Sequence, residues 1–237
     1  QNVLSDYDGK LLEGMVSNED ALNYATVELD KEQTELLLTK SNAAYNTQIN
    51  DLLLTAFSYA LREMTCETVI HITLEGHGRE EIDASIDINR TVGWFTTIYP
   101  VRIELQDKLD ASIKYIKETL RQIPNKGIGY GALLGYVGNN LPKISFNYLG
   151  QFDKDGGKET WNIVDEDSGN TLALENYDSN IINVNGLTIA GKMQFTVASK
   201  LGVQNTKHLA QVFKGKLQEI INHTLSQTRA YLTVSDV

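Results

Sequence analysis

Apolar residues recur every three or four positions in three stretches of the chain, which is the period of a helix with one buried face. These stretches cover residues 49–64, 107–124 and 209–225. Asp30 stands where an N-cap would begin a further helix that runs to about residue 45. The pattern therefore predicts four main helices.

Runs of β-branched and apolar residues mark the expected strands, which occupy residues 26–29, 68–74, 143–149 and 187–199. Helical and extended stretches are interleaved along the chain, an order typical of helices that cover a mixed sheet. There is no internal repeat and no low-complexity tract. The fold class expected from the pattern is α/β, with a mixed β-sheet flanked by helices.

The composition is that of an ordered, core-forming chain. Of 237 residues, 41% are hydrophobic and 22% are charged, which excludes intrinsic disorder as the main state. No apolar run approaches the ~18 residues of a membrane-spanning helix, and the first residues lack the pattern of a signal peptide. We therefore expect a cytoplasmic protein with no membrane partner. One cysteine, Cys66, excludes an internal disulfide framework and is expected to be a half-buried spectator.

The net charge of −10 is concentrated in two segments. Residues 1–40 hold nine acidic and three basic side chains, a net of −6, and residues 153–178 hold eight acidic and two basic ones, again −6. The remaining chain is nearly neutral and lacks the concentrated basic face that binding along a nucleic-acid backbone needs. A nucleic-acid partner is therefore set aside. Residues 1–26, acidic and weakly periodic, are expected to form a linker.

The most unusual cluster is Glu75-Gly76-His77-Gly78-Arg79-Glu80, which follows an apolar strand. Partial desolvation at the strand end would raise the pKa of the Glu75 carboxyl toward the range useful for general acid or base catalysis. The residues alone favour a plainer interpretation, a structural ion pair between Glu75 and Arg79 at a turn. His77 is equally explained as a turn residue, and His71 as a residue packed in the strand.

Other candidate sites have weaker support. The four histidines show no metal-ligand spacing, residues 124–131 lack the Lys-Ser/Thr of a phosphate loop, and there is no nucleophile elbow. Trp94, Phe95 and Tyr99 surround Gly93, and they suit either the wall of a tunnel for an extended ligand or a core strand with a bulge. Residues 146–152 are predicted to form a strand whose last residues are polar and aromatic.

Five blocks, in this order along the chain, resemble the motif series of the epimerization domains of nonribosomal peptide synthetases. They are residues 44–56, 75–80, 90–100, 124–131 and 146–152, and residues 232–236 resemble the family's closing stretch. The Glu-Gly-His-Gly-Arg-Glu hexapeptide and the order of the blocks make the match specific. One small departure is Gln48, where the family often has Glu.

A larger departure is the absence of the family's leading His-His-x-x-x-Asp-Gly motif from this sequence, which begins at Gln1. In the family that motif lies in an N-terminal lobe, and the catalytic cleft forms between the two lobes. The resemblance implies that residues 27–237 are the C-terminal lobe of an epimerization domain, with residues 1–26 as an inter-lobe linker segment and the N-terminal lobe absent. An isolated lobe is expected to be inactive.

The resemblance also implies a fold and a reaction. The fold is a lobe similar to chloramphenicol acetyltransferase. The reaction is L-to-D inversion at Cα of an aminoacyl or peptidyl thioester on the 4′-phosphopantetheine arm of a peptidyl carrier protein, an isomerase step in antibiotic biosynthesis. It requires no metal and no cofactor of the lobe's own. The implied partners are the carrier protein, the N-terminal lobe of the same domain and neighbouring synthetase domains.

Roles for individual residues follow from the resemblance. Glu75 would act as acid or base at Cα, and histidines of the missing lobe would supply the second group. Arg79 would orient Glu75 or balance charge near the enolate, and Tyr148 would contact the intermediate. The expected substrate-binding and wall residues are His77, Asn147, Trp94, Phe95 and Tyr99.

Two other functions are considered beside this one. A condensation domain shares the fold and the histidine motif but forms a peptide bond, and the block at residues 75–80 argues against it because condensation domains do not carry that block. A lobe that only docks a carrier protein is the second alternative. The intact Glu75, Arg79 and Tyr148 argue against such a degenerate lobe.

Overall fold

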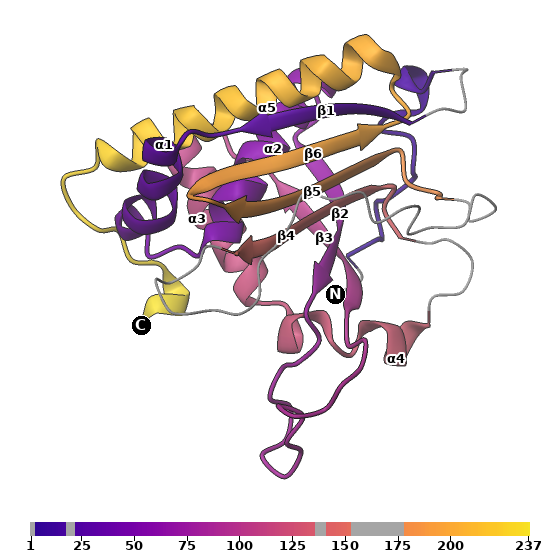
Figure 1. Ribbon diagram of the computed structural model, residues 1–237, viewed down its shortest axis with the longest axis vertical. Coiled ribbons are helices and arrows are strands. Elements are labelled where there is room, and N and C mark those ends of the chain that lie inside the picture. Colours follow the sequence, from indigo (N-terminus) through magenta and orange to yellow (C-terminus); the bar gives the residue numbers. More distant parts are fainter. Residues whose placement is uncertain (1–2, 18–21, 136–140, 153–177) are drawn as a thin grey trace.

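A six-stranded mixed sheet runs through the part of the chain that the computed structural model describes, residues 3–17, 22–135, 141–152 and 178–237 (Figure 1). The strand order is β1-β6-β5-β4-β2-β3, in which β4 is parallel to both β2 and β5 and the other neighbours are antiparallel. The expectation of a mixed sheet is confirmed. The strands are β1 (Asn23–Glu28), β2 (Val69–Gly76), β3 (Thr97–Glu104), β4 (Ile144–Gln151), β5 (Ile182–Ile189) and β6 (Lys192–Ser199).

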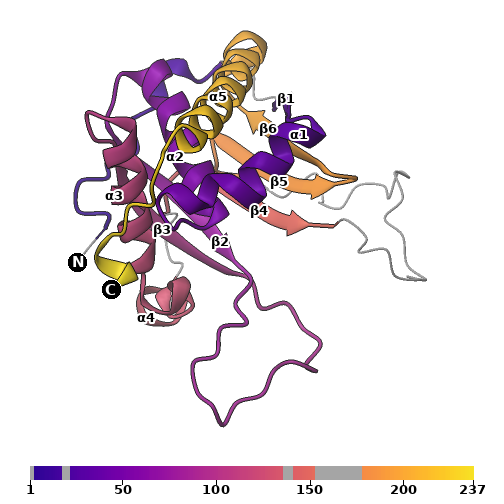
Figure 2. The same cartoon turned by 90° about the vertical axis from the view of Figure 1, so that its left-hand side faces the viewer.

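The helices cover one face of this sheet, as the two perpendicular views show for α2, α3 and α5 (Figures 1 and 2). The α-helices are α1 (Lys31–Glu35), α2 (Ile49–Thr65), α3 (Leu109–Arg121), α4 (Tyr130–Leu134) and α5 (Gly202–Leu225). The short helices are η1 (Glu13–Met15), the π-helix η2 (Leu36–Lys40), η3 (Ser41–Ala44), η4 (Pro124–Gly127) and η5 (Val234–Asp236). The helix expected from residue 30 is therefore a run of three helical types, α1, η2 and η3. Asp30 caps it by accepting a hydrogen bond from the Gln33 amide at 2.8 Å.

Four phenylalanines join the helices to the sheet. Phe57 of α2 and Phe213 of α5 pack against Phe146 of β4 and Phe195 of β6, and each of these side chains is at most 2% exposed. The closest pair of rings, Phe195 and Phe213, has centroids 5.1 Å apart in an edge-to-face arrangement. This cluster fixes which face of each strand is buried, so the alternate residues of β4, β5 and β6 point to the other face.

Two local expectations were wrong. The single strand expected at residues 187–199 is a hairpin of β5 and β6, whose turn residues Ala190 and Gly191 have φ of 49° and 75°. Positive φ at both central positions suits the twist of a two-residue hairpin, but alanine is a weak signal for it. Cys66 is exposed rather than half-buried, and it ends α2 in a left-handed conformation with φ of 63°. The acidic stretch at residues 153–177 lies outside the described residues.

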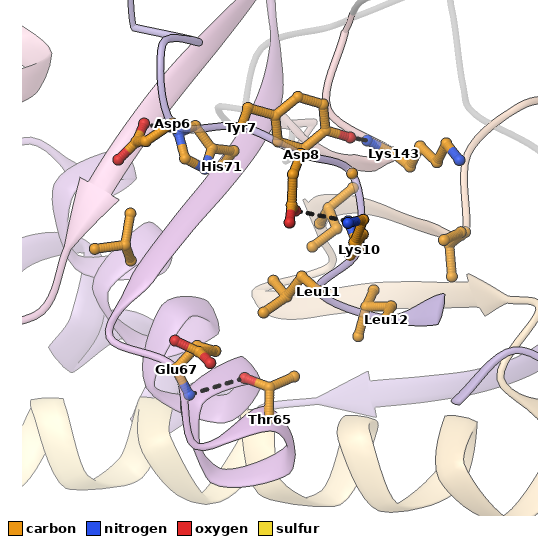
Figure 3. Close-up of a pocket in the computed structure, with 14 residues that line it drawn as sticks. Asp6, Tyr7, Asp8, Lys10, Leu11, Leu12, Thr65, Glu67, His71 and Lys143 are labelled. Carbon is orange, nitrogen blue, oxygen red and sulfur yellow. Dashed lines mark hydrogen bonds and ion pairs between the residues drawn. The ribbon is translucent and has the colours of Figure 1, made fainter. Parts of the chain in front are cut away.

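The N-terminal residues of the described chain lie against the sheet. Asp6 contacts His71 Nε2 at 3.0 Å, and the Tyr7 hydroxyl accepts a hydrogen bond from the Lys143 amide at 3.1 Å (Figure 3). Asp6 also accepts a hydrogen bond from Arg102 Nε at 2.8 Å. His71 is 7% exposed, which confirms that it is packed in its strand. The expected linker thus includes contacts with β2 and β3, and β1 begins inside it, at Asn23.

The C-terminal residues also contact the rest of the fold. Asp236 accepts hydrogen bonds from Lys117 of α3 at 2.5 Å and from Asn46 at 2.7 Å, and Lys117 is 1% exposed. Lys117 keeps the pKa of the Asp236 carboxyl well below its usual range. Glu118 accepts a hydrogen bond from the Ser235 hydroxyl at 2.6 Å. None of the helices within the described ranges is long and apolar enough to span a bilayer.

Candidate functional site

Glu75 and Asn147 meet on the sheet face opposite the helices. Strands β2 and β4 are parallel and pair Leu74 with Phe146, so the next positions, Glu75 and Asn147, are side by side. Leu74 and Phe146 point into the core, and alternation therefore turns Glu75 and Asn147 to the other face. The Asn147 Nδ2 donates a hydrogen bond to Glu75 Oε2 at 3.1 Å. Two blocks that lie 72 residues apart in the sequence thus form one site.

The electrostatics of Glu75 agree with the expectation from its place at the strand end. Partial desolvation by neighbouring groups raises the pKa of the Glu75 carboxyl above its usual value, although Glu75 is an exposed residue. No ion pair to Glu75 forms within the described residues, and its carboxylate accepts a hydrogen bond from the neutral Asn147 amide. The structural ion pair with Arg79 that the residues alone favoured is not formed. Glu75 is therefore a partly desolvated carboxyl held by one neutral donor.

Arg79 is bound to the loop between β2 and β3 instead. Its guanidinium donates to the carbonyls of Ile88 and Thr91, each at 3.0 Å, and to that of Gly93 at 3.4 Å. Its carbon Cζ also lies 4.2 Å from the centroid of the Phe95 ring, in cation–π contact. These contacts close the long loop on itself. Arg79 organises the loop beside Glu75 and does not touch the Glu75 carboxylate.

His77 and Glu80 tie the same motif to the segment after α3. The His77 Nδ1 accepts a hydrogen bond from the Arg79 amide at 3.0 Å, so its Nε2 carries the proton that faces Glu80 at 2.9 Å. The other oxygen of Glu80 pairs with Lys126 at 3.0 Å. Gly78 is required here, because its φ is +64° and a Cβ would lie 1.6 Å from the Phe95 carbonyl oxygen. Most residues of the hexapeptide thus form and stabilise the turn that follows Glu75.

The aromatic residues of the next block lie in different environments. Tyr99 is 9% exposed and packs on Gly127, where a Cβ would lie 2.2 Å from its ring. Burial, with Glu80 nearby, raises the pKa of the Tyr99 hydroxyl. Phe95 is half-buried beneath Arg79, whereas Trp94 is 92% exposed. Of these three, Trp94 has the surface free to contact another molecule.

Tyr148 lies on the other face of the sheet from Glu75. It pairs in register with Gly186, and its ring faces Phe195 at a centroid distance of 6.1 Å. Its hydroxyl is 2.9 Å from the hydroxyl of Thr188, a fully buried residue. The structure therefore brings Asn147, and not Tyr148 or Arg79, to the Glu75 carboxylate.

Sequence reasoning did not identify the direct bond between Asn147 and Glu75. The two strands are far apart in the sequence, and their parallel pairing leaves no local signal. Sequence reasoning also missed β5 before residue 187, and with it Asn185, which is paired with Asn147 in register. Within the described ranges no three His, Cys, Asp or Glu side chains come together as a metal site. The site as it stands can take up or release one proton at Glu75.

One pocket among the described residues lies elsewhere. It has a volume of about 400 Å³ and is formed by the N-terminal segment over the start of β2, where Asp6, Tyr7, His71 and Lys143 line it (Figure 3). His71 is four residues from Glu75 along the strand, a separation of roughly 13 Å. The candidate site lies at Glu75, a partly desolvated carboxylate without an ionic partner in the described chain, whereas Asp6 in the pocket is already bound to His71 and Arg102.

The model of the condensation domain family matches residues 16–237 of the chain. The chain belongs to the condensation domain family. Gramicidin S synthase 1 of Brevibacillus brevis is 39% identical to it over 244 residues, which include 94% of this chain and 22% of that protein. This condensation-family chain therefore spans about a fifth of the length of that relative.

Solved structures extend the comparison. The epimerization domain from the third module of tyrocidine synthetase B superposes with a TM-score of 0.77 at 35% identity, over 86% of this chain and 49% of that one. The condensation domain from the Monacolin K polyketide synthase gives a TM-score of 0.63 at 14% identity, over 88% of this chain and 48% of that one. The second likeness shows the fold alone. Both confirm the expected condensation-type fold, and this chain corresponds to about half of each structure.

Proposed function

We propose that this condensation-family chain is the C-terminal lobe of an epimerization domain of a nonribosomal peptide synthetase. Its activity would be that of an isomerase, which inverts Cα of an aminoacyl or peptidyl thioester on a carrier protein's phosphopantetheine arm. The observation that carries the proposal is the Glu75 carboxylate, partly desolvated, without an ionic partner in the described chain and bonded to Asn147 at 3.1 Å. The likeness to an epimerization domain at 35% identity supports it.

The proposed chemistry needs two proton-transfer groups on opposite faces of Cα. A base removes the Cα proton, and the electron pair of the broken C–H bond moves into the thioester to form an enolate. An acid then returns a proton to the opposite face, which inverts the centre. Glu75 supplies one of these groups, since a carboxyl with a raised pKa exchanges protons more readily near neutral pH. We assign the other group to the N-terminal lobe of the complete domain.

Asn147 has a positioning role in this proposal. By donating to Oε2 it holds the carboxylate in place, and it leaves Oε1 directed away from that bond and able to reach the substrate. Arg79, His77 and Glu80 support the turn after Glu75 and are not assigned proton transfer. The lobe needs no metal or cofactor of its own in this scheme. Its partners would be the carrier protein, the N-terminal lobe and neighbouring synthetase domains.

The test joins this chain to its N-terminal lobe and supplies an aminoacyl carrier protein in deuterated water. We expect deuterium at Cα and accumulation of the D-epimer. Glu75→Gln keeps the shape and can still accept the hydrogen bond from Asn147, but it cannot take up the proton, so exchange should fall about 10²- to 10⁴-fold. Glu81→Gln, an exposed position in the same loop, is the matched control and should retain wild-type exchange.

Three results would count against the proposal. Wild-type exchange in Glu75→Gln would exclude Glu75 as an essential acid or base. A two-lobed protein that forms a peptide bond between two carrier-bound substrates, without deuterium at Cα, would be a condensation domain. Carrier binding without either reaction would indicate a docking lobe.

A further inference from the structure

A row of polar side chains extends from the candidate site across the sheet face that lies opposite the helices. Asn147 is paired in register with Asn185 of β5, Asn185 with Thr196 of β6, and Thr196 with Thr26 of β1. Residues paired in this way share a face, so all of them lie on the face that carries Glu75. The row therefore runs from Glu75 across β4, β5 and β6 to the edge strand β1.

Several polar side chains of the neighbouring rows on the same face are hydrogen-bonded within the protein. On one side, the Thr73 hydroxyl donates to a backbone carbonyl at 2.7 Å, and Asn183 donates to Asp178 at 2.6 Å. On the other side, Gln194 donates to Glu28 at 2.9 Å. These contacts explain why polar residues occupy those positions.

The row that contains Asn185 is different. Asn185, Thr196 and Thr26 are exposed, and their side chains make no hydrogen bond to any other residue in the described ranges. Asparagine is depleted in strands, so Asn185 in the middle of β5 has no explanation in the packing of the fold. Its carboxamide has a donor and an acceptor on one planar group, the arrangement that pairs with both sides of a secondary amide.

The distance from Glu75 indicates what such a group could bind. Adjacent strands are about 4.8 Å apart, so Asn185, two strands away, lies roughly 10 Å from Glu75 across the sheet. At this distance Asn185 is too far from Glu75 to contact the atoms bonded to the reacting Cα. It is within reach of the secondary amides of the substrate, which occur both in the phosphopantetheine arm and in an upstream peptide.

We propose that Asn185 is a further substrate-positioning residue, whose carboxamide binds a secondary amide of the thioester-linked substrate while Glu75 faces Cα. This inference rests on the proposed epimerase function. Asn185 takes no part in proton transfer, and its effect is on where the substrate lies.

The test measures kcat and KM for deuterium exchange at Cα in the two-lobed protein. The probes are an aminoacyl pantetheine thioester, a dipeptidyl ethyl thioester and an aminoacyl ethyl thioester, which has no secondary amide. Asn185→Ala should raise KM roughly three- to tenfold, the effect of one lost neutral hydrogen bond, for a substrate that carries the bound amide. KM for the aminoacyl ethyl thioester should not change, and neither should kcat or the melting temperature. Asn185→Gln, which retains the carboxamide, should recover part of the loss.

Asn183→Ala is the matched control on the same face of β5. Its bonds to Asp178 and Asn180 are structural, so it should lower the melting temperature without a selective rise in KM. A rise confined to the pantetheine thioester would identify the arm as the ligand of Asn185, and a rise confined to the dipeptidyl substrate would identify the peptide. Unchanged KM for every probe in Asn185→Ala, with exchange intact, would overturn this inference and leave the proposed function standing. Absence of exchange in the wild-type protein would overturn the proposed function itself.

Discussion

Arg79→Lys separates a loop-organising role of Arg79 from a role in the chemistry at Glu75. The guanidinium binds three carbonyls of residues 88–93 and stacks on Phe95. Lysine keeps the charge but has no planar fork, so it can satisfy one of these carbonyls at a time. We therefore expect the loop between β2 and β3 to open more often, while the bond between Glu75 and Asn147 remains.

The size of the effect follows from the contacts. Hydrogen bonds to a charged donor contribute about 1.5–3 kcal/mol when protected, but Arg79 is exposed, so roughly 0.5–1 kcal/mol for each of the two shorter bonds is appropriate. An exposed cation–π contact contributes about 0.5–1 kcal/mol more. Allowing for the bond that lysine retains, the loop should lose about 1.5 kcal/mol, which corresponds to roughly tenfold more frequent opening.

Amide hydrogen exchange measures this opening directly. The Thr91 amide donates to the Ile88 carbonyl at 3.0 Å, so its protection reports whether the loop is closed. Arg90→Lys is the control, since Arg90 is exposed in the same loop and makes no hydrogen bond or ion pair with the rest of the described chain. Unchanged protection at Thr91 in Arg79→Lys would refute the loop-organising role. So would a loss of Cα exchange chemistry as large as that of Glu75→Gln with the loop still closed.

Two further predictions concern stability. Gly186→Ala should destabilise the fold by about 1–3 kcal/mol, because a Cβ there would lie 2.2 Å from the buried Phe195 ring. Gly215→Ala, with open space around it in α5, should instead stabilise by about 0.5–1 kcal/mol in the same urea titration, and a similar loss in both variants would contradict this packing argument. The raised pKa of Glu75 means that the folded protein holds a proton there which the unfolded chain has lost, so the carboxyl reduces stability as the pH rises from 4.5 through the raised pKa. The stability of Glu75→Gln relative to wild type should therefore increase over that range, and a stability difference that stays constant with pH, or that shifts in favour of wild type, would show that Glu75 is not desolvated.

The helices were predictable because their signal is local and repeated. The apolar spacing from Ile49 onward is enough to place α2, and Asp30 is an N-cap recognisable by residue type alone. The hairpin of β5 and β6 was not predictable, since its turn contains Ala190, a residue that seldom adopts a positive φ. Strand boundaries that depend on such a turn become visible only when the paired strand is known.

The sequence likewise predicts some features of the candidate site and not others. The raised pKa of Glu75 was expected from its position after an apolar strand, which is a property of the adjacent sequence. The bond from Asn147 requires β2 and β4 to be parallel neighbours, and nothing in either segment specifies the other. Arg79 was expected near Glu75 because it is close in sequence, but the path of the loop carries its guanidinium to the carbonyls of residues 88–93.

The C-terminal contacts determine where this chain can be joined to another protein in a hybrid. Lys117 is 1% exposed and relies on the Asp236 carboxylate, with the Tyr45 carbonyl at 2.9 Å as its other partner. A junction that replaces the last few residues would leave a buried ammonium group without its counter-ion, an arrangement that strongly destabilises proteins. A junction placed after residue 236 keeps the charge pair and the Ser235–Glu118 bond together. The useful crossover point therefore lies beyond η5, and not at the end of α5 where the regular helix stops.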